Sequence, residues 1–345
     1  MTLNRLLCIV FLPALMLSAC APRPQDCARA DVFCAGLVTD FGSINEGINQ
    51  EAWQGLLEAK AEGLVDRMDA IETIDVRDRS KNISTFAEDE YDVIITTGAS
   101  ISNETMAAAR KYPKILFVGV EQPQDLKRRN LSGLVFHEDR SGFLSGALAA
   151  LITQTNRIAA LCDAKFIDPM RRYCDGFQAG AKYIDPEVHV TVSYREGSQD
   201  KLFNDPDWGR AEALRVVSEG VDVLFAAGGG TADAALEAAA EQGAYVIGAE
   251  ADPYTRMIDV RPRLVTSAIN DIRSGVNELM RLTRAGQFPS GNYFGQNLLA
   301  PFHESERQIP QSIKDRLDLI EKKLSDSSIQ TEIPWSESEP LNQIP

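Results

Sequence analysis

A regular alternation of short apolar runs with segments of helical spacing constrains the fold of this chain more than any other feature. Seven runs have the length and content of buried strands: 36–40, 92–97, 114–120, 157–162, 189–194, 221–227 and 245–249. After the first run, residues 51–63 have helical spacing, with Trp53 and Leu56 on one side. Strand, helix and strand in repetition predict an α/β fold with mostly parallel sheets that helices flank on both faces.

The chain is long enough for two lobes. It has 345 residues, of which 44% are hydrophobic. Because domains average about 150 residues, this length predicts two lobes.

The clearest helix boundary in the sequence follows Asn204. Asp205 is a typical N-cap, and Pro206 suits the first helical position. Gly220 is a typical residue for the C-terminal end of that helix.

Polar residues or glycines follow the predicted strands at the point where each strand ends. They are Asp40, Gly98, Glu121, Gly228 and Glu250. Open parallel sheets bind ligands at the carboxyl ends of their strands, so two lobes would present two rows of such residues to one cleft. Each residue taken singly is explained equally well by a turn or a helix cap. The set as a whole predicts a ligand site between the lobes.

The run Gly228-Gly229-Gly230-Thr231 invites comparison with phosphate-binding loops. It lacks the Gly-Lys-Ser/Thr ending of a P-loop and the glycine spacing of a dinucleotide fingerprint. We interpret it as a tight turn in which a ligand can contact the backbone, with Thr231 capping the next helix.

The N-terminal segment has the features of a secretory signal. Arg5 precedes an apolar run over 6–17, which is too short to cross a bilayer as a helix of about 20 residues. The run closes in Leu-Ser-Ala-Cys, which resembles the lipobox of bacterial lipoproteins. We therefore predict a signal peptide over 1–19 and a lipid on Cys20 that tethers the chain to a cell membrane. An ordinary cleaved signal with an incidental cysteine is the alternative.

Charge and histidine content exclude some functions. The formal charge is −15, and it becomes −16 when 1–19 is removed, because Arg5 is the only charged side chain there. So acidic a chain is not expected to bind nucleic acid, which requires a basic patch. His137, His189 and His303 are isolated along the sequence, so we expect no metal site and no cofactor.

Four cysteines remain when the signal segment and Cys20 are set aside. An even number outside the cytoplasm predicts two disulfides. The simplest pairs are Cys27–Cys34 and Cys162–Cys174, which each close a short loop, although the sequence allows other pairings.

The order of several motifs resembles the basic membrane protein family of substrate-binding lipoproteins. The matching segments are 38–45 (VTDFGSIN), 49–55 (NQEAWQG), 141–146 (SGFLSG), 176–180 (GFQAG), 226–231 (AAGGGT) and 245–252 (YVIGAEAD). The resemblance implies the type I periplasmic-binding-protein fold, in which two lobes joined by three crossovers close over a ligand. It also implies a function, because several members bind purine nucleosides for ABC importers.

The resemblance carries individual residues over to this chain. Asp40 matches the family aspartate after the first strand, and Asn45 and Asn49 match asparagines that help to hold the base. Phe203 corresponds to a pocket phenylalanine, and Gly228 to a glycine beside the ribose.

Four positions depart from the family pattern. Glu121 and Glu250 stand where the carboxylates that hold the ribose are usually aspartate. Asn270 replaces a lysine near the hinge, and Ile48 replaces the aromatic residue that stacks on the base. The resemblance therefore implies a nucleoside-like ligand and leaves the exact ligand open.

The residue chemistry also suits a heterocycle that carries hydroxyl groups. A carboxylate accepts hydrogen bonds from two neighbouring hydroxyls, and an amide both donates and accepts. Phe41, Phe203 and Tyr254 could flank a flat ring, but each is explained equally well as a core or rim residue. Gly98 and Gly229, in turns after strands, complete the expected ligand-binding set.

We therefore expect a monomeric, lipid-anchored protein, facing the periplasm or exterior, that delivers a small polar ligand to an ABC permease. A ligand sensor for a membrane receptor would share these features. A hydrolase using Asp40, Glu121 and Glu250 is the third alternative, but no nucleophile elbow or metal signature accompanies these carboxylates.

The expected organisation has five parts. They are a signal peptide over 1–19, a lipid-anchored spacer over 20–33, a first lobe over 34–136 completed by about 270–288, a second lobe over 137–265 completed by about 289–310, and a C-terminal helix and tail over 311–345.

Overall fold

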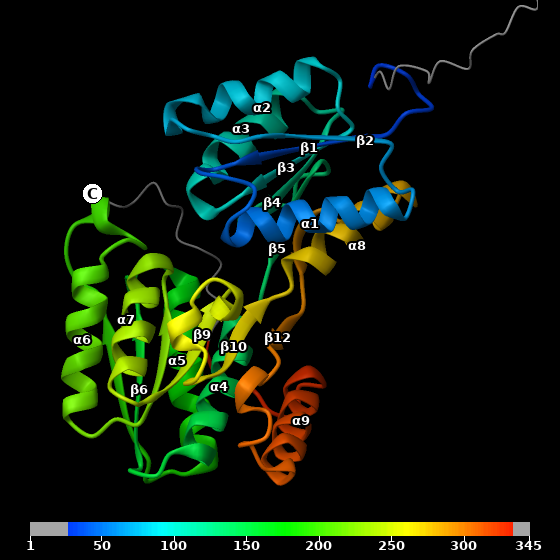
Figure 1. The fold of residues 1–345 in the computed structure, drawn as a ribbon. Coiled ribbons are helices and arrows are strands. Elements are labelled where there is room, and N and C mark those ends of the chain that lie inside the picture. Colours follow the sequence, from blue (N-terminus) through cyan, green and yellow to red (C-terminus); the bar gives the residue numbers. More distant parts are fainter. Residues whose placement is uncertain (1–26, 334–345) are drawn as a thin grey trace, which may run out of the picture.

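The first lobe is built on a six-stranded parallel sheet. The structure, a computed structural model, describes residues 27–333 (Figure 1). The strands of this sheet are β1 (Cys34–Thr39), β2 (Arg67–Ile71), β3 (Val93–Thr97), β4 (Leu116–Val120), β5 (Leu131–Val135) and β11 (Gly291–Phe294). Their order is β11-β5-β4-β3-β1-β2, and every neighbouring pair is parallel.

The second lobe repeats this plan. Its strands are β6 (Arg157–Cys162), β7 (His189–Tyr194), β8 (Val223–Ala227), β9 (Tyr245–Glu250), β10 (Leu264–Asn270) and β12 (Asn297–Leu299). Their order is β12-β10-β9-β8-β6-β7, in which β12 is antiparallel to β10 and the other pairs are parallel. The predicted α/β class with two mostly parallel sheets is confirmed.

Helices cover both faces of each sheet (Figure 1). In the first lobe, α1 (Gly47–Ala61) and α8 (Ile272–Arg284) share one core, and α2 (Arg79–Glu88) and α3 (Ser102–Lys111) share the other. In the second lobe, one core joins α4 (Glu138–Ile152), α5 (Asp168–Ile184) and α9 (Gln311–Ser325), and the other joins α6 (Pro206–Ser218) and α7 (Gly229–Glu241). Short 3-10 helices lie at Val76–Asp78, Ala99–Ile101, Gln199–Lys201, Pro253–Thr255, Ile258–Val260 and His303–Ser305.

The central strands are apolar because both of their faces are covered. Every residue of β1, β3, β5 and β8 is buried. Full burial of one Val, Leu or Ile side chain stabilises the folded state by about 1.5–3 kcal/mol. This burial explains why the runs lack the alternation of a sheet with one solvent-exposed face.

The helix α6 begins and ends where the sequence predicts. The Asp205 carboxylate accepts a hydrogen bond from the backbone N–H of Trp208 (3.4 Å), and Pro206 is the first helical residue. Gly220 follows the helix with a φ of 97°, a conformation that glycine adopts without a steric penalty.

The predicted capping role of Thr231 is wrong. Gly228, whose φ is 125°, precedes a helix that begins at Gly229, so Thr231 lies inside its first turn. The Thr231 hydroxyl donates instead to Asp163 Oδ2 (2.9 Å) and accepts from the Asp205 N–H (2.9 Å). The side chain therefore connects three segments of the second lobe.

Three crossovers join the lobes. The chain passes from β5 to α4, from β10 to α8 and from β11 to β12. The last return to the second lobe lies after Phe294 and not at the expected 289, because Gly291–Phe294 pairs with Ser132–Val135. The expected boundary missed this edge strand, which completes the hydrogen bonding of β5.

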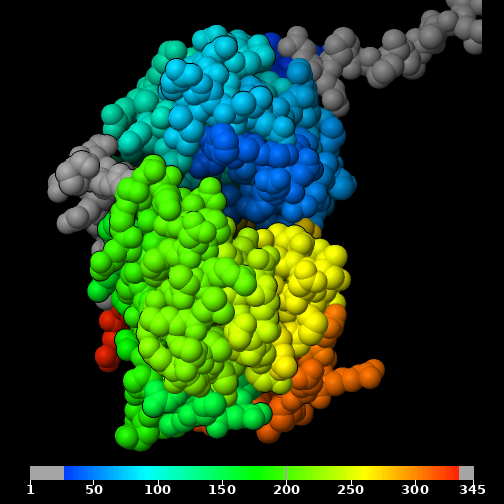
Figure 2. All heavy atoms as spheres, turned by 60° about the vertical axis from the view of Figure 1, so that its left-hand side comes forward, coloured from blue at the N-terminus to red at the C-terminus, as the bar shows by residue number. Residues whose placement is uncertain are grey.

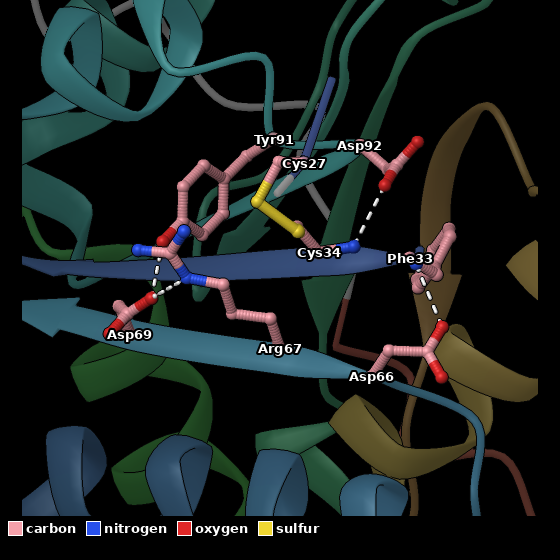
Figure 3. Close-up of a disulfide and its surroundings, with 8 residues drawn as sticks. All are labelled: Cys27, Phe33, Cys34, Asp66, Arg67, Asp69, Tyr91 and Asp92. Atoms are coloured by element: carbon pink, nitrogen blue, oxygen red, sulfur yellow. Dashed lines mark hydrogen bonds and ion pairs between the residues drawn. A yellow bond between two sulfur atoms is a disulfide. The ribbon is translucent and has the colours of Figure 1, made fainter. Parts of the chain in front are cut away.

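A disulfide between Cys27 and Cys34 fastens the start of the described chain to β1 (Figure 3). The Cys34 N–H donates to Asp92 Oδ2 (2.7 Å), and the Phe33 N–H donates to Asp66 Oδ2 (2.8 Å). Cys27 is only 7% exposed. Residues 27–33 therefore belong to the first lobe and not to the expected spacer, because the disulfide and these hydrogen bonds hold them there.

The second disulfide joins Cys162, the last residue of β6, to Cys174 in α5.

The last described residues, after α9, contact the second lobe. Ile329 packs against the core that α9 shares with α4. The Thr331 hydroxyl donates to Asp139 Oδ2.

Across residues 27–333, no helix has both the length and the apolar character needed to span a membrane.

Candidate functional site

The carboxyl ends of the strands in both lobes line a cleft of about 1910 Å³. Figure 2 shows the first lobe (blue) above the second (green and yellow), with a furrow between them. The cleft exceeds the roughly 300–1,000 Å³ of a typical small-molecule pocket, as expected when two lobes stand apart. Of the predicted site residues, it is lined by Asp40, Asn45, Gly98, Glu121, Phe203, Gly229, Glu250 and Asn270.

Asp40 follows β1 and is held by neighbours in the first lobe. Its Oδ2 accepts from the Ser100 hydroxyl (2.7 Å) and lies 4.0 Å from an Arg79 nitrogen. Burial raises the pKa of Asp40, while the hydrogen bond from Ser100 and the charge of Arg79 oppose that rise. A Cβ on Gly98 would lie 2.5 Å from Oδ2, and Gly98 has a φ of 92°. This position therefore requires glycine.

Asn49 does not line the cleft, contrary to the predicted role. Its amide group donates to the carbonyls of Phe41 (3.1 Å) and Ser43 (3.3 Å) and accepts from the Thr97 hydroxyl (2.5 Å). The side chain is buried and shapes the loop after β1. Its hydrogen-bonding capacity is used within the first lobe.

Phe41 and Asn45 in this loop, and Ile48 at the start of α1, differ in position. Phe41 is 60% exposed and lies outside the cleft lining, whereas Asn45 and Ile48 line the cleft. Asn45 donates from its side-chain amide to the Ser43 hydroxyl (3.1 Å). Asn45 is therefore the asparagine of this loop that can reach a ligand.

Glu121 connects the cleft to the crossovers. Asn270, at the end of β10, donates to Glu121 Oε1 (3.1 Å). The same Asn270 side chain accepts from the Tyr173 hydroxyl (3.1 Å) and from the Asn297 amide (2.8 Å). Burial, together with the charge of Glu250, raises the pKa of Glu121 to about 8. The carboxyl group is therefore mostly protonated near neutral pH.

Glu250 stands at the end of β9, beside the glycine-rich turn. Its Oε2 accepts from the N–H groups of Gly228 and Gly229, each at 3.1 Å. Burial raises the pKa of Glu250, and these two hydrogen bonds oppose the rise. Gly228 does not line the cleft, because it packs against Asp163: a Cβ on Gly228 would lie 2.5 Å from the Asp163 Cβ.

Asp163 was missed by the sequence reasoning, although it follows the predicted strand 157–162 as the other polar residues follow theirs. It is fully buried and lies 3.3 Å from the Arg195 guanidinium. It also accepts from the backbone N–H of Phe203 (3.2 Å) and from the Thr231 hydroxyl. Asp163 thus positions Phe203, which is 36% exposed and has a φ of 59°.

Aromatic residues near the cleft are distributed differently from the expectation. Phe203 lines the cleft, and so does Phe166, which is 52% exposed and was missed. Phe166 lies in the loop after β6, so the strand-end rule also applies to it. The Tyr254 ring is stacked on the His303 ring (3.8 Å between centroids), and the Arg261 guanidinium lies over the Tyr254 ring. Tyr254 is therefore a rim residue with partners of its own.

The described residues hold no group of three or more His, Cys, Asp or Glu side chains arranged to bind a metal ion. The carboxylates of the cleft are instead hydrogen-bonded to hydroxyl, amide and backbone groups. Such carboxylates can accept further hydrogen bonds from a ligand.

Comparison with known proteins gives a family match across most of the chain. Residues 34–297 match the Bmp family, described as "ABC transporter substrate-binding protein PnrA-like". The CD4+ T-cell-stimulating antigen of Listeria innocua is 26% identical, over 94% of this chain and 96% of that protein. The ABC transporter nucleoside-binding protein BmpA of Lactococcus lactis is 26% identical, over 76% and 78%. Basic membrane protein A of Borreliella burgdorferi is 22% identical, over 95% of each.

Solved structures show the same fold at low sequence identity. An ABC transporter solute-binding protein from Aeropyrum pernix has a TM-score of 0.69 and 18% identity, covering 86% of this chain and 92% of that one. A transcriptional activator of comK from Bacillus halodurans has a TM-score of 0.72 and 21% identity, covering 86% and 99%. The two lobes thus have the type I periplasmic-binding-protein fold.

Proposed function

The chain belongs to the Bmp family of PnrA-like ABC transporter substrate-binding proteins, and on that premise we propose that its interlobe cleft captures a nucleoside-like ligand for an importer. The family consists of substrate-binding proteins and not of enzymes, so the carboxylates in the cleft serve binding. This membership sets aside the hydrolase alternative and keeps an ABC permease as the expected partner.

The observation that carries the proposal is the placement of three carboxylates at strand ends around one cleft. Asp40 and Glu121 come from the first lobe, and Glu250 comes from the second. Carboxylates form strong hydrogen bonds with the vicinal hydroxyls of a sugar. Asn45 offers an amide to a base edge, and Phe203 offers an aromatic face. The relative from Lactococcus lactis, a nucleoside-binding protein, supports the same ligand class.

The lipid anchor is part of this proposal. Cys20 and the segment 1–19 lie outside the described residues, so the support comes from the Leu-Ser-Ala-Cys motif and from the basic membrane protein relatives. A tethered binding protein would stay near its permease. Cys20→Ser should release the protein from the membrane fraction or block its processing, and unchanged membrane association would contradict the anchor.

The proposal is tested by calorimetry with adenosine, guanosine and inosine on the purified chain 27–345. We expect one of them to bind, and Asp40→Asn to weaken that binding by about 1.5–3 kcal/mol, the usual scale for a hydrogen bond to a charged group. The amide still accepts the Ser100 hydrogen bond, so the unfolding midpoint of the empty variant should stay near that of the natural protein. Asp259→Asn, on the exposed surface of the second lobe, is the matched control.

Two outcomes would count against the assignment. Absence of heat with every nucleoside would remove this ligand class, and mass spectrometry of the ligand retained in native purification would then identify its replacement. Equal binding by Asp40→Asn and the natural protein would show that the ligand does not contact Asp40. A sensor that serves a receptor would bind the same ligand but would fail to support uptake by a permease.

A further inference from the structure

Two segments of the second lobe bring apolar side chains to the cleft. The segment from β6 into α5 contributes Phe166, Ile167, Pro169 and Met170, and the segment from β7 to α6 contributes Leu202 and Phe203. We call these six residues the apolar wall. Phe166 is 52% exposed and Phe203 is 36% exposed. Exposed apolar surface that is gathered in a cleft is typical of a ligand-binding groove.

Local structure imposes the exposure of Phe166. The N–H of Ile167 donates to the carbonyl of Ala164 (3.0 Å), which closes a four-residue turn with Phe166 as its third member. The disulfide Cys162–Cys174 fixes the strand end before this turn to the helix after it. Among residues 27–333, no ring-stacking or cation–π contact involves Phe166. The turn therefore holds in the cleft lining an aromatic ring that lacks a ring or cation partner within these residues.

Asp163 holds the two aromatic residues of the wall near each other. Its Oδ2 accepts from the backbone N–H of Phe203 (3.2 Å). Phe166 follows Asp163 by three residues, so the Cα atoms of these two residues are at most about 11 Å apart. The buried Arg195 guanidinium, 3.3 Å away, fixes Asp163 in turn. One ligand can therefore contact both phenylalanines.

The apolar wall borders the carboxylate of the second lobe. The Gly230 N–H donates to the Phe203 carbonyl (2.8 Å), and the Gly229 N–H donates to Glu250 Oε2 (3.1 Å). A Cβ on Gly229 would lie 2.8 Å from the Phe203 carbonyl oxygen. Phe203 thus lies against the turn that holds Glu250. A ligand whose hydroxyl groups bind Glu250 would place an attached ring against the wall.

The basic side chains beside the wall have partners. Arg171 lies 3.2 Å from Asp168, and Arg256 donates to both carboxylate oxygens of an aspartate in α7. The Lys165 ammonium lies over the tyrosine ring at the end of β7, 5.5 Å from its centroid. The other basic residues of the cleft lining belong to the first lobe: Arg110 and Arg128. The wall therefore favours an uncharged ring.

We propose that Phe166 is a specificity-determining residue of this cleft, whose ring stacks, together with that of Phe203, on a flat heterocycle of the ligand. This inference rests on the proposed function, and it adds the requirement that the ligand carries an uncharged aromatic ring. Every base has a π-face, so an aromatic side chain stacks on any of them. Phe166 thus selects ligands that have a flat ring over ligands, such as free sugars, that have none.

The first test compares ligands with and without the ring. Calorimetry on the purified intact protein would measure adenosine, guanosine and inosine, the free base of whichever binds most tightly, and methyl β-D-ribofuranoside. We expect Phe166→Ala to weaken the nucleoside and its free base by at least about five-fold, the lower end of what one base–aromatic stack contributes. The riboside, which lacks the ring, should not distinguish the variant from the natural protein.

Two further variants separate stacking from a structural effect. Phe166→Tyr keeps the aromatic face and should keep the natural affinity for the nucleoside. The matched control is Phe41→Ala, because Phe41 is 60% exposed and lies outside the cleft lining. This variant removes the same atoms and should keep the full affinity. Equal nucleoside binding by Phe166→Ala and the natural protein would overturn the inference and leave the nucleoside assignment intact.

A second measurement makes no assumption about the ligand. The natural protein, Phe166→Ala and Phe41→Ala are purified under native conditions, and mass spectrometry identifies and quantifies the compound that each retains. We expect a compound with a flat aromatic ring, retained in smaller amount by Phe166→Ala than by the other two proteins.

The retained compound separates the two proposals. A flat-ring compound that is not a nucleoside, with reduced retention in Phe166→Ala, would contradict the nucleoside assignment and support the role of Phe166. A compound without a flat ring would overturn that role. If no compound is retained and no nucleoside binds in calorimetry, both proposals fail.

Discussion

Single residues near the cleft show how this protein tolerates buried charge. Glu138 and Arg172 have side chains that are 3% and 2% exposed, and the corresponding values for Asp163 and Arg195 are 0% and 1%. Burying an isolated charge is far more costly than burying a pair. Each carboxylate therefore depends on its guanidinium partner, whereas Glu121 has no such partner within residues 27–333.

We predict that Arg172→Ala lowers the free energy of unfolding by about 3–5 kcal/mol, because it leaves Glu138 buried and unpaired. Burial already raises the pKa of Glu138. The deficit should therefore be largest where Glu138 would be ionised and should shrink as falling pH protonates it. The control is Arg210→Ala, which breaks an exposed pair with Glu241 and should cost less than about 1 kcal/mol. Urea unfolding at pH 7 and pH 5 measures both variants, and equal losses would contradict the prediction.

At this scale, sequence reasoning found residues whose position follows from the backbone. Asp40, Glu121 and Glu250 line the cleft because each lies at the carboxyl end of a parallel strand, and that rule needs no tertiary information. The role of Asn49 could not be predicted in this way, because its partners are carbonyl groups that approach it only when the loop after β1 folds. Tyr254 is a similar case, since His303 is distant in sequence.

Between elements, the closest packing occurs where α4 meets α5. Gly142 and Gly146 on α4 and Gly176 and Gly180 on α5 place each helix backbone against the other. A Cβ on Gly146 would lie 1.9 Å from the Phe177 carbonyl oxygen. The glycines in these two sequence motifs therefore serve helix packing.

We predict that Gly146→Ala destabilises the protein by about 1–3 kcal/mol, the usual cost of overpacking. Helix propensity alone predicts the opposite sign, because alanine is favoured over glycine by about 1 kcal/mol inside a helix. The contact with backbone atoms of Phe177 decides the sign, since backbone cannot move aside as a flexible side chain can. Chemical denaturation of the variant tests this, and a gain in stability would show that the helices separate easily.

A second prediction at this scale concerns the disulfides, which join a preceding segment to β1 and connect β6 to α5. Each should stabilise the protein by about 2–4 kcal/mol by restricting the unfolded chain. Thiol titration of the denatured, unreduced chain from 27 to 345 should find almost no free thiol. Four reactive thiols in protein isolated from the exported fraction would contradict the pairing.

Strands differed in how well the sequence revealed them. The apolar runs that became β1, β3, β6 and β8 are buried on both faces, so their composition alone identified them. The edge strand Arg67–Ile71 contains charged residues and was missed. Gly291–Phe294 was missed for a different reason: it is four residues long, and its partner in β5 is distant in sequence. Pairing across such a distance carries no local sequence signal.

Across the whole molecule, a polar chain links the cleft to the crossovers. The backbone N–H of His137 donates to Asn297 Oδ1 (2.8 Å), the Asn297 side-chain amide donates to Asn270 Oδ1, and the Asn270 side-chain amide donates to Glu121. The rings of His137 and Phe294 are also stacked, 4.5 Å between centroids. These residues come from all three crossovers, so a ligand that changes the position of Glu121 acts on the segments about which the lobes would rotate.

We predict that ligand binding closes the lobes and reduces the radius of gyration in small-angle X-ray scattering. The reason is that Asp40 and Glu121 belong to one lobe and Glu250 to the other, so a ligand gains its full set of hydrogen bonds only when the lobes approach each other. Such differential contacts are what shift a conformational equilibrium. Asp40→Asn, measured at a ligand concentration that saturates the natural protein but not the variant, should contract less. Asp259→Asn should contract fully. An unchanged radius in the saturated natural protein would show that the cleft binds its ligand without closure.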